Sequence, residues 1–365
     1  MNKNSLNFVD IFCGAGGFSS GLESSGHKCI LGIDYEKSAI ETFKENHKNS
    51  MAFHGNICDL TNSNLKKMLK DTTIDLIVGG PPCQGFSTVG KGDPNDQRNK
   101  LFLEYFRIVK LLKPKFIIIE NVTGLIAQKN TFILNSIFKK FKSIGYDLDC
   151  KVLSADNYQV PSRRRRTIFI GNNQGIRNIY PDEIKDKILT GEALRKINQK
   201  LPNHDLRSAR INNKIDLERI KRIPQGKGIR YQKDEDAYFN KKLKLNIDWS
   251  KLRENRLRQT KYQRLDRRTV APTILTHRNC YYHPSQDRYL TIREAARLQS
   301  FPDHFKFMGT ITSQWRQLGN AVPPKLAFHL GASLKKMNTL KRNKLVKEIS
   351  REEYLLNVRE RAFSY

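Results

Sequence analysis

The sequence has few cysteines and no long apolar runs, and each of these features excludes a class of protein. Its six cysteines in 365 residues include no Cys-x-x-Cys pair and no regular spacing, which indicates neither a disulfide framework nor a zinc site. No stretch approaches the roughly 20 apolar residues that a membrane span requires. The amino terminus leads straight into a strand-like run without the apolar core of a signal peptide. We therefore expect a reduced, cytoplasmic protein with no metal site.

Acidic residues are also scarce. The chain has 36 Asp and Glu against 66 Lys and Arg, a formal net charge of +30. So large an excess repels itself and favours a polyanionic partner. Nucleic acid is the leading partner. An anionic membrane surface is the weaker alternative, because no basic amphipathic helix of the required kind stands out. Charge alone does not separate DNA from RNA.

The first part of the chain, about 170 residues, alternates strand-like and helix-like patterns, which predicts an α/β fold with a parallel sheet covered on both faces. Short apolar runs of the buried-strand type are separated by segments with apolar residues at helical spacing, such as Leu101, Tyr105, Ile108 and Leu112. Strands are expected at Asn7–Phe12, Lys28–Asp34, Ile74–Val78, Phe116–Ile119 and Thr167–Ile170.

The composition and the hydrophobic pattern change after residue 171. Residues 172–287 are rich in Lys, Arg and Asn and show no clear periodicity, which indicates a second, smaller and basic domain. The alternative is a solvated or partly disordered insertion, against which its scattered aromatic residues argue. Order returns over 288–335, where an amphipathic helix follows Pro323-Pro324. Residues 336–365 alternate in charge and are expected to form an exposed helical extension.

A glycine-rich turn follows the first predicted strand. Gly14 and Gly16 would let a ligand approach the backbone and the amino terminus of the next helix closely. Asp34 ends the second predicted strand, about 20 residues further on, where an acidic residue commonly bonds ribose hydroxyls. Together these features favour a turn that binds an adenosine-containing cofactor over a purely structural turn. They do not identify the cofactor.

A single thiol stands at the carboxyl end of a third predicted strand. Cys83 lies in Gly79-Gly80-Pro81-Pro82-Cys83-Gln84, on a loop that two prolines stiffen. Ligands bind at this edge of an open α/β sheet, and such a loop can supply the geometry and lowered pKa of a nucleophile. Read alone, the thiol is more often a small structural hydrophobe. Glu120, taken alone, is likewise an ordinary strand-end carboxylate.

In their order along the chain, these segments resemble the cytosine-C5 DNA methyltransferases, over about residues 6 to 335. The glycine turn resembles the first motif of that family and Pro81-Pro82-Cys83-Gln84 its nucleophile motif. The unmatched basic region, 172–287, falls where the family places its target-recognition domain. Further similar segments are Asp96 to Phe102 (with Asn99 where glycine is usual), Glu120-Asn121-Val122, Ser162 to Arg166, Arg288 to Pro302 and Gln317 to Pro323.

The resemblance implies a Rossmann-like methyltransferase sheet that binds S-adenosyl-L-methionine. Phe12 would stack on the adenine and Asp34 would bind the ribose. Asn56 stands where the family usually has an aspartate, and its side-chain oxygen can still accept a hydrogen bond from the adenine amino group, so we expect weakened cofactor binding. The other positions implied to contact the cofactor are Gly14, Gly16, Tyr35, Ile57, Pro81, Leu101, Asn320 and Val322.

The resemblance also implies a covalent mechanism. Cys83 would attack carbon 6 of a cytosine flipped out of the duplex, and Glu120 would protonate or hydrogen-bond ring N3. Arg164 and Arg166, at alternate positions of an extended segment, would hold the cytosine O2, Glu120 or phosphates through their planar forks. Ser162 replaces the usual glutamine of this motif. The run of arginines is also consistent with simple phosphate binding.

We therefore predict a sequence-specific, bacterial type of DNA (cytosine-5-)-methyltransferase that acts on double-stranded DNA as a monomer. Its expected setting is a restriction-modification system, in which it protects host DNA from a cognate restriction endonuclease. Two alternatives stay open: an RNA cytosine-C5 methyltransferase on the same scaffold, and a DNA-binding relative that has lost catalysis. The set Cys83, Glu120, Arg164 and Arg166 argues against the second alternative.

Overall fold

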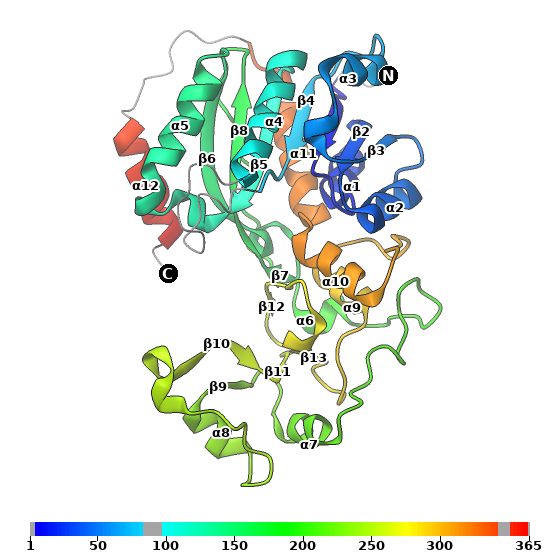
Figure 1. The fold of residues 1–365 in the computed structure, drawn as a ribbon, viewed down its shortest axis with the longest axis vertical. Helices are drawn as coiled ribbons and strands as arrows, with labels where there is room; N and C mark the ends of the chain where they lie inside the picture. Colours follow the sequence, from blue (N-terminus) through cyan, green and yellow to red (C-terminus); the bar gives the residue numbers. More distant parts are fainter. Residues whose placement is uncertain (1–3, 83–96, 342–350, 364–365) are drawn as a thin grey trace. The chain divides into compact units, whose positions relative to one another are not determined.

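The computed structural model describes residues 4–82, 97–341 and 351–363, and its chain forms two compact units (Figure 1). The first unit comprises Met1–Tyr158, Arg164–Lys185 and Ala321–Tyr365, and the second comprises Gln159–Arg163 and Asp186–Asn320. Contacts therefore group 288–320 with the second unit, whereas the sequence assigns them to the first domain. The assignment of catalytic and target-recognition roles to these parts stays a prediction.

The first unit is built around a seven-stranded sheet with the order β3-β2-β1-β4-β5-β8-β6. The first five of these strands are parallel, and β8 is antiparallel to both β5 and β6. The predicted α/β class is confirmed, and the predicted parallel pairing holds for five strands but not for β8. No helix crosses over between β6 and β8, so the chain returns antiparallel. The strands are β1 (Asn7–Ile11), β2 (Lys28–Asp34), β3 (Met51–His54), β4 (Leu76–Gly79), β5 (Phe116–Val122), β6 (Asp147–Ser154) and β8 (Arg165–Asn172).

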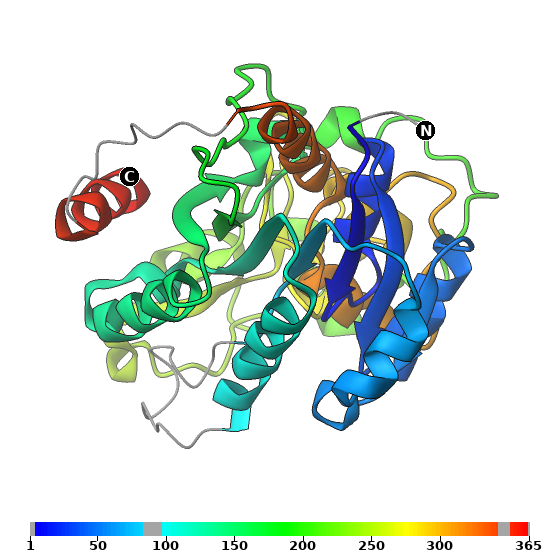
Figure 2. The same ribbon diagram turned by 90° about the horizontal axis from the view of Figure 1, so that it is seen from above.

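Helices cover both faces of this sheet (Figure 2). Side chains of α3, α4 and α5 join those of β1, β4 and β5 in one apolar core, which explains why these strands read as continuous apolar runs. On the other face α1 packs closely on α11. Gly21 permits this approach, since a Cβ at that position would overlap the carbonyl of Pro324. The helices are α1 (Gly17–Ser24), α2 (Lys37–Asn46), α3 (Asn62–Leu69), α4 (Gln97–Leu112), α5 (Thr131–Lys142), α11 (Pro324–Asn338) and α12 (Arg351–Phe363).

The last helix, α12, docks on the edge strand β6. The Tyr354 hydroxyl lies 2.6 Å from both the backbone nitrogen and the carbonyl oxygen of Cys150. Leu355 and Val358 are buried in the core, and Arg359 donates to the Ile126 carbonyl at 2.9 Å. The expectation of an exposed tail is therefore wrong for α12. The helix covers a strand edge that would otherwise present unpaired backbone groups.

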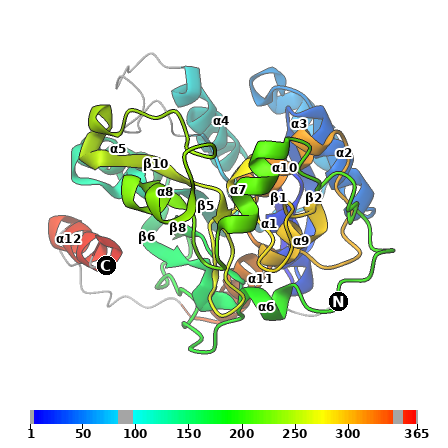
Figure 3. The same cartoon turned by 90° about the horizontal axis from the view of Figure 1, so that it is seen from below.

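The second unit contains short helices, among them α6, α7, α8, α9 and α10 (Figure 3). It also contains three two-stranded pairs, β9 with β10, β11 with β13, and β7 with β12. Ile220, Ile229 and Trp249 are buried in its own apolar core, and the Arg219 guanidinium lies 5.6 Å from the centre of the Tyr262 ring. The basic middle region is thus a packed domain rather than a disordered insertion. Its elements are β7 (Ser162–Arg163), β9 (Ile229–Tyr231), β10 (Arg256–Lys261), β11 (Gln263–Arg264), β12 (Ala271–Pro272), β13 (Tyr281–Tyr282), α6 (Thr190–Ala193), α7 (Lys214–Arg222), α8 (Gln232–Tyr238), α9 (Ile292–Leu298) and α10 (Ile311–Asn320).

Among the residues that the structure describes, no helix combines the length and the apolar character needed to cross a bilayer.

Candidate active site

The turn between β1 and α1 has left-handed backbone at three positions. Phe12, Gly14 and Gly16 have φ values of 63°, 54° and 88°, and the turn is closed by a 2.9 Å hydrogen bond from Gly16 N–H to the Cys13 carbonyl. The two glycines serve different purposes. A Cβ at Gly14 would enter open space, whereas a Cβ at Gly16 would overlap the His47 ring. The turn therefore leaves an open cradle at Gly14 and is packed from behind at Gly16.

Asp34 joins this turn to the end of β2. Its carboxylate accepts hydrogen bonds from the backbone N–H groups of Gly14, at 2.8 Å, and Glu36, at 2.9 Å. Burial raises the pKa of the Asp34 carboxyl, and these two N–H groups oppose the rise. A carboxylate can accept about four hydrogen bonds, so the backbone N–H groups of Gly14, Tyr35 and Glu36 leave capacity for a ligand hydroxyl. Tyr35, the next residue, is 70% exposed. The hydrogen bond between Gly14 and Asp34 joins the two segments that carry Phe12, Gly14, Gly16, Asp34 and Tyr35.

Asn56 caps the short helix η1 (Ile57–Asp59). Its side-chain oxygen accepts a 3.1 Å hydrogen bond from the Cys58 N–H, and the side chain is exposed. An amide oxygen has two lone pairs, so this cap leaves one for an incoming donor. Ile57 is buried in the core, and Leu101 lies half-buried against the same core.

Glu120 lies on β5, and its carboxylate faces a cation from β8. The Arg166 Nε lies 2.8 Å from Glu120 Oε1, and the two side chains are only 18% and 12% exposed. The contact is an ion pair by distance, yet Oε1 has no well-aligned hydrogen bond within the described part of the chain. A Cβ at Gly80 would come within 3.3 Å of Glu120 Oε2. The carboxylate thus lies against the backbone that leads to Cys83.

A second arginine completes a cluster of three charges. Arg164 is 2% exposed. Burial lowers the pKa of its guanidinium to about 9, Arg166 acts in the same direction, and Glu120 opposes both. In the sheet, Arg166 pairs with Val122, two residues beyond Glu120. The structure therefore brings Glu120, Arg164 and Arg166 together at the carboxyl end of β5, where they carry a net charge of one positive unit.

Asn121 holds the loop that leads to the thiol, a contact that the sequence did not reveal. Its side-chain amide donates a 3.0 Å hydrogen bond to the carbonyl of Pro81, which is buried. Its oxygen accepts from the Val122 N–H at 2.9 Å. The position of Asn121 directly after Glu120 was the available signal. Cys83 itself lies outside the described residues.

The remaining predicted residues lie on other elements. Val322 is nearly buried just ahead of α11 in the first unit, and Asn320 ends α10 in the second unit. Ser162 lies on β7 opposite Ala271 and is fully buried. Its hydroxyl has no hydrogen-bond partner within residues 4–82, 97–341 and 351–363.

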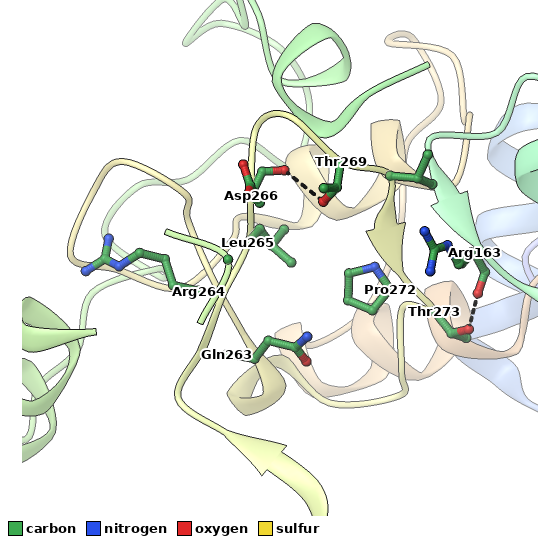
Figure 4. Close-up of a pocket in the computed structure, with 10 residues that line it drawn as sticks. Arg163, Gln263, Arg264, Leu265, Asp266, Thr269, Pro272 and Thr273 are labelled. Carbon is green, nitrogen blue, oxygen red and sulfur yellow. Dashed lines mark hydrogen bonds between the residues drawn. The ribbon is translucent and has the colours of Figure 1, made fainter. Parts of the chain in front are cut away.

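The second unit carries a pocket of about 480 Å³ between β11, β12 and β7 (Figure 4). The Thr273 hydroxyl donates to the carbonyl of Arg163 at one wall. Arg264 points away and donates to the carbonyls of Ile220 and Ile223. The lining residues are Arg163, Gly226, Gln263, Arg264, Leu265, Asp266, Thr269, Val270, Pro272 and Thr273.

Fold and site together define an α/β enzyme whose polar groups gather at the carboxyl ends of parallel strands, the usual ligand-binding edge. Comparison with known proteins makes the class specific. Residues 6–336 match the model of the C-5 cytosine-specific DNA methylase family, and the chain belongs to that family.

Individual relatives agree. The chain is 34% identical to the type II methyltransferase M1.HphI of Haemophilus parahaemolyticus, covering 92% of this chain and 88% of the relative. It is 31% identical to M.FnuDI of Fusobacterium nucleatum, covering 94% and 98%. Among solved structures, a candidate DNA modification methyltransferase encoded within an Escherichia coli prophage aligns with a TM-score of 0.72 and 28% identity, covering 92% and 100%.

The chain is therefore an enzyme, a DNA cytosine-C5 methyltransferase that transfers a methyl group from a donor to DNA. The family, fold class and activity predicted from the sequence are confirmed. The RNA alternative is not favoured.

Proposed function

We propose that S-adenosyl-L-methionine is the methyl donor and that the turn after β1 binds it. The open cradle at Gly14 fits an approaching ligand, because a side chain there would occupy the space beside the turn. Gly16 caps α1, whose first N–H groups favour a negatively charged or polar ligand group. The residues that we expect to hold the donor are Phe12, Gly14, Gly16, Asp34, Tyr35, Asn56, Ile57, Pro81, Leu101, Asn320 and Val322.

When bound, the donor supplies an electrophilic methyl group on its sulfonium sulfur. The protein must make carbon 5 of cytosine nucleophilic. The thiolate of Cys83 adds to carbon 6, which breaks the aromatic system and places electron density on carbon 5. A proton on Glu120 is shared with ring N3 and disperses the charge that develops. After carbon 5 is methylated, its proton passes to water and the electron pair of that C–H bond restores the double bond between carbons 5 and 6. The bond from sulfur to carbon 6 breaks at the same time, and its electrons return to sulfur as the thiolate.

The cluster at the end of β5 is the observation that carries this mechanism. Arg166 holds the Glu120 carboxylate at 2.8 Å, and Asn121 holds the Pro81 carbonyl two residues before Cys83. Adjacent residues of β5 thus supply the acid, Glu120, and the side chain that fixes Pro81, which is Asn121. Arg164 and Arg166 supply the positive charge that would hold the cytosine O2 or a phosphate.

We propose that the second unit recognises the target sequence in double-stranded DNA. Lysine and arginine side chains would contact phosphates, and base edges would be read from its loops. In the pocket, the Gln263 carboxamide extends toward Pro272 and has both a donor and an acceptor for a base edge (Figure 4). Arg256, by contrast, is paired with Glu254 at 2.6 Å, which makes it a poorer candidate for base contact.

The biological setting follows from the relatives, which are named type II methyltransferases. We propose that the enzyme acts in the cytoplasm as a monomer and protects host DNA from a cognate restriction endonuclease.

Methyl-labelled S-adenosylmethionine, offered with duplex DNA, tRNA or no acceptor, tests the activity and the donor together. We expect label on DNA, and a stable covalent adduct with a duplex that carries 5-fluorocytosine at the target site. Cys83→Ala should abolish transfer and the adduct while binding the donor as the wild type does. Cys58→Ala, at an exposed cysteine of the first unit, is the matched control and should retain activity. Full transfer by the Cys83→Ala enzyme would overturn the mechanism.

A further inference from the structure

His47 is a buried side chain that the proposed mechanism does not use. It follows α2, and its side chain is 2% exposed. One ring nitrogen, Nδ1, lies 2.6 Å from Glu23 Oε2, and the other, Nε2, lies 3.2 Å from the Gly16 carbonyl oxygen. The ring stacks on Phe43 with its centre 4.4 Å away. His47 is therefore held on three sides, directly behind the glycine turn.

The contact with Gly16 fixes a peptide group at the start of α1. The same carbonyl accepts a 2.8 Å hydrogen bond from the Ser20 N–H, the first of the helix. A carbonyl oxygen has two lone pairs, and Ser20 and His47 together occupy both. Because Gly16 has a φ of 88° and belongs to the turn that contains Gly14, fixing its carbonyl also limits how the turn can move.

Both hydrogen-bond partners of the ring are acceptors. A carboxylate and a carbonyl have no hydrogen to donate, so an imidazole with a proton on each nitrogen satisfies both. The negative groups around the ring are Glu23 and the buried Asp10, whose carboxyl interacts with His47 electrostatically. The Nε2 contact thus places a hydrogen-bond donor on the carbonyl of the turn, and the Nδ1 contact with Glu23 orients the ring.

We propose that His47 is a positioning residue for the methyl donor: it holds the Gly16 carbonyl and keeps the Gly14 cradle in its binding geometry. Glu23 acts behind it by fixing the orientation of the ring. The inference rests on the proposed binding of S-adenosylmethionine at this turn. It predicts an effect on donor affinity that exceeds any general loss of stability.

Two amide substitutions separate the two contacts of the ring. In His47→Gln the amide nitrogen can occupy roughly the place of Nε2 and keep the bond to Gly16, whereas in His47→Asn the shorter side chain reaches toward Glu23 only. We expect His47→Asn to weaken S-adenosylmethionine binding about tenfold, as for loss of one buried hydrogen bond. His47→Gln should stay within about threefold of the wild type.

His27 provides the matched control. It is also buried in the first unit, and its ring bonds the Leu6 N–H at 3.1 Å and the Gly331 carbonyl at 2.9 Å, away from the glycine turn. His27→Asn should lower the melting temperature as His47→Asn does but leave donor affinity unchanged. Titration calorimetry of the full chain with S-adenosylmethionine gives the affinity, and a duplex-binding assay without donor should be the same for all variants.

Glu23→Ala extends the test without removing the histidine. Glu23 is 33% exposed, so its loss is tolerable for folding, and it should weaken donor binding several-fold. If His47→Asn binds the donor as tightly as His47→Gln does, or if His27→Asn weakens it equally, the positioning role is wrong. If the wild type itself binds no S-adenosylmethionine, the proposed donor is wrong instead.

Discussion

Replacing Glu120 by Gln should destabilise the protein strongly, because it leaves Arg164 and Arg166 side by side without their shared carboxylate. At 2.8 Å, the attraction between Glu120 and Arg166 is about 6 kcal/mol with an effective dielectric constant of about 20. Desolvation of the two groups cancels part of this gain. Breaking a buried pair by removing one partner typically costs about 3–5 kcal/mol. Since both side chains keep a little exposure, we expect a loss of about 3 kcal/mol.

A double-mutant cycle isolates the pair. Urea unfolding of the wild type, Glu120→Gln, Arg166→Gln and the double variant should give a coupling free energy of about 2 kcal/mol. Lys142 and Asp147 form a matched control in the same unit, with side chains 63% and 52% exposed. Their cycle should give a coupling below about 0.5 kcal/mol, because water screens an exposed pair.

Activity supplies the second measurement for the same variants. Both single variants should lose methyl transfer while binding S-adenosylmethionine normally, since neither side chain lies at the glycine turn. A coupling free energy no larger than that of the Lys142–Asp147 control would refute the picture of a desolvated charge cluster. Normal transfer by Glu120→Gln would refute its role at cytosine N3.

Three further predictions concern other residues of the first unit. Gly16→Ala should destabilise the protein more than Gly14→Ala does, because both strain a left-handed backbone but only Gly16 meets His47; equal melting temperatures would contradict this. Tyr354→Phe should cost about 1–3 kcal/mol in urea unfolding, since one hydroxyl serves both backbone groups of Cys150, and an unchanged midpoint would show that water replaces it. Burial raises the pKa of Asp10 from 3.8 to about 7, so the folded state binds this proton more tightly than the unfolded state. The carboxyl therefore lowers stability as pH rises from about 4 to 7, and the gain from Asp10→Asn in urea unfolding should be larger at pH 8 than at pH 5; a gain independent of pH would refute the shift.

Local sequence patterns were enough to predict the half of the fold that surrounds the glycine turn. The strand Lys28–Asp34 and the buried run at Phe116 were readable because strands buried on both faces are continuously apolar. The roles of Gly14 and Asp34 could be predicted because glycine marks a tight turn and an acidic residue stands at the end of a predicted strand. The family resemblance then placed Glu120 and the two arginines in one site, where the structure brings them together.

Other features depend on contacts between distant segments and left no local signal. The antiparallel course of β8 follows from how it returns beside β5, which its apolar run does not encode. The alternating charges of the last helix suggested exposure, but Leu355 and Val358 are buried because β6 offers an open edge. His47 reads as an ordinary helix-end residue until Glu23 and Gly16 are seen on either side of its ring.

The charge balance of the cluster at the end of β5 bears on catalysis itself. Arg164 and Arg166 carry one formal positive charge more than Glu120 balances, and burial lowers the pKa of the Arg164 guanidinium. An anion that enters the site balances this excess charge, whether it is a phosphate oxygen or the negative charge that develops on cytosine during thiolate attack. Under the proposed mechanism the two arginines would therefore be compensated best when charge develops on the base, which is the arrangement that stabilises a transition state over a ground state.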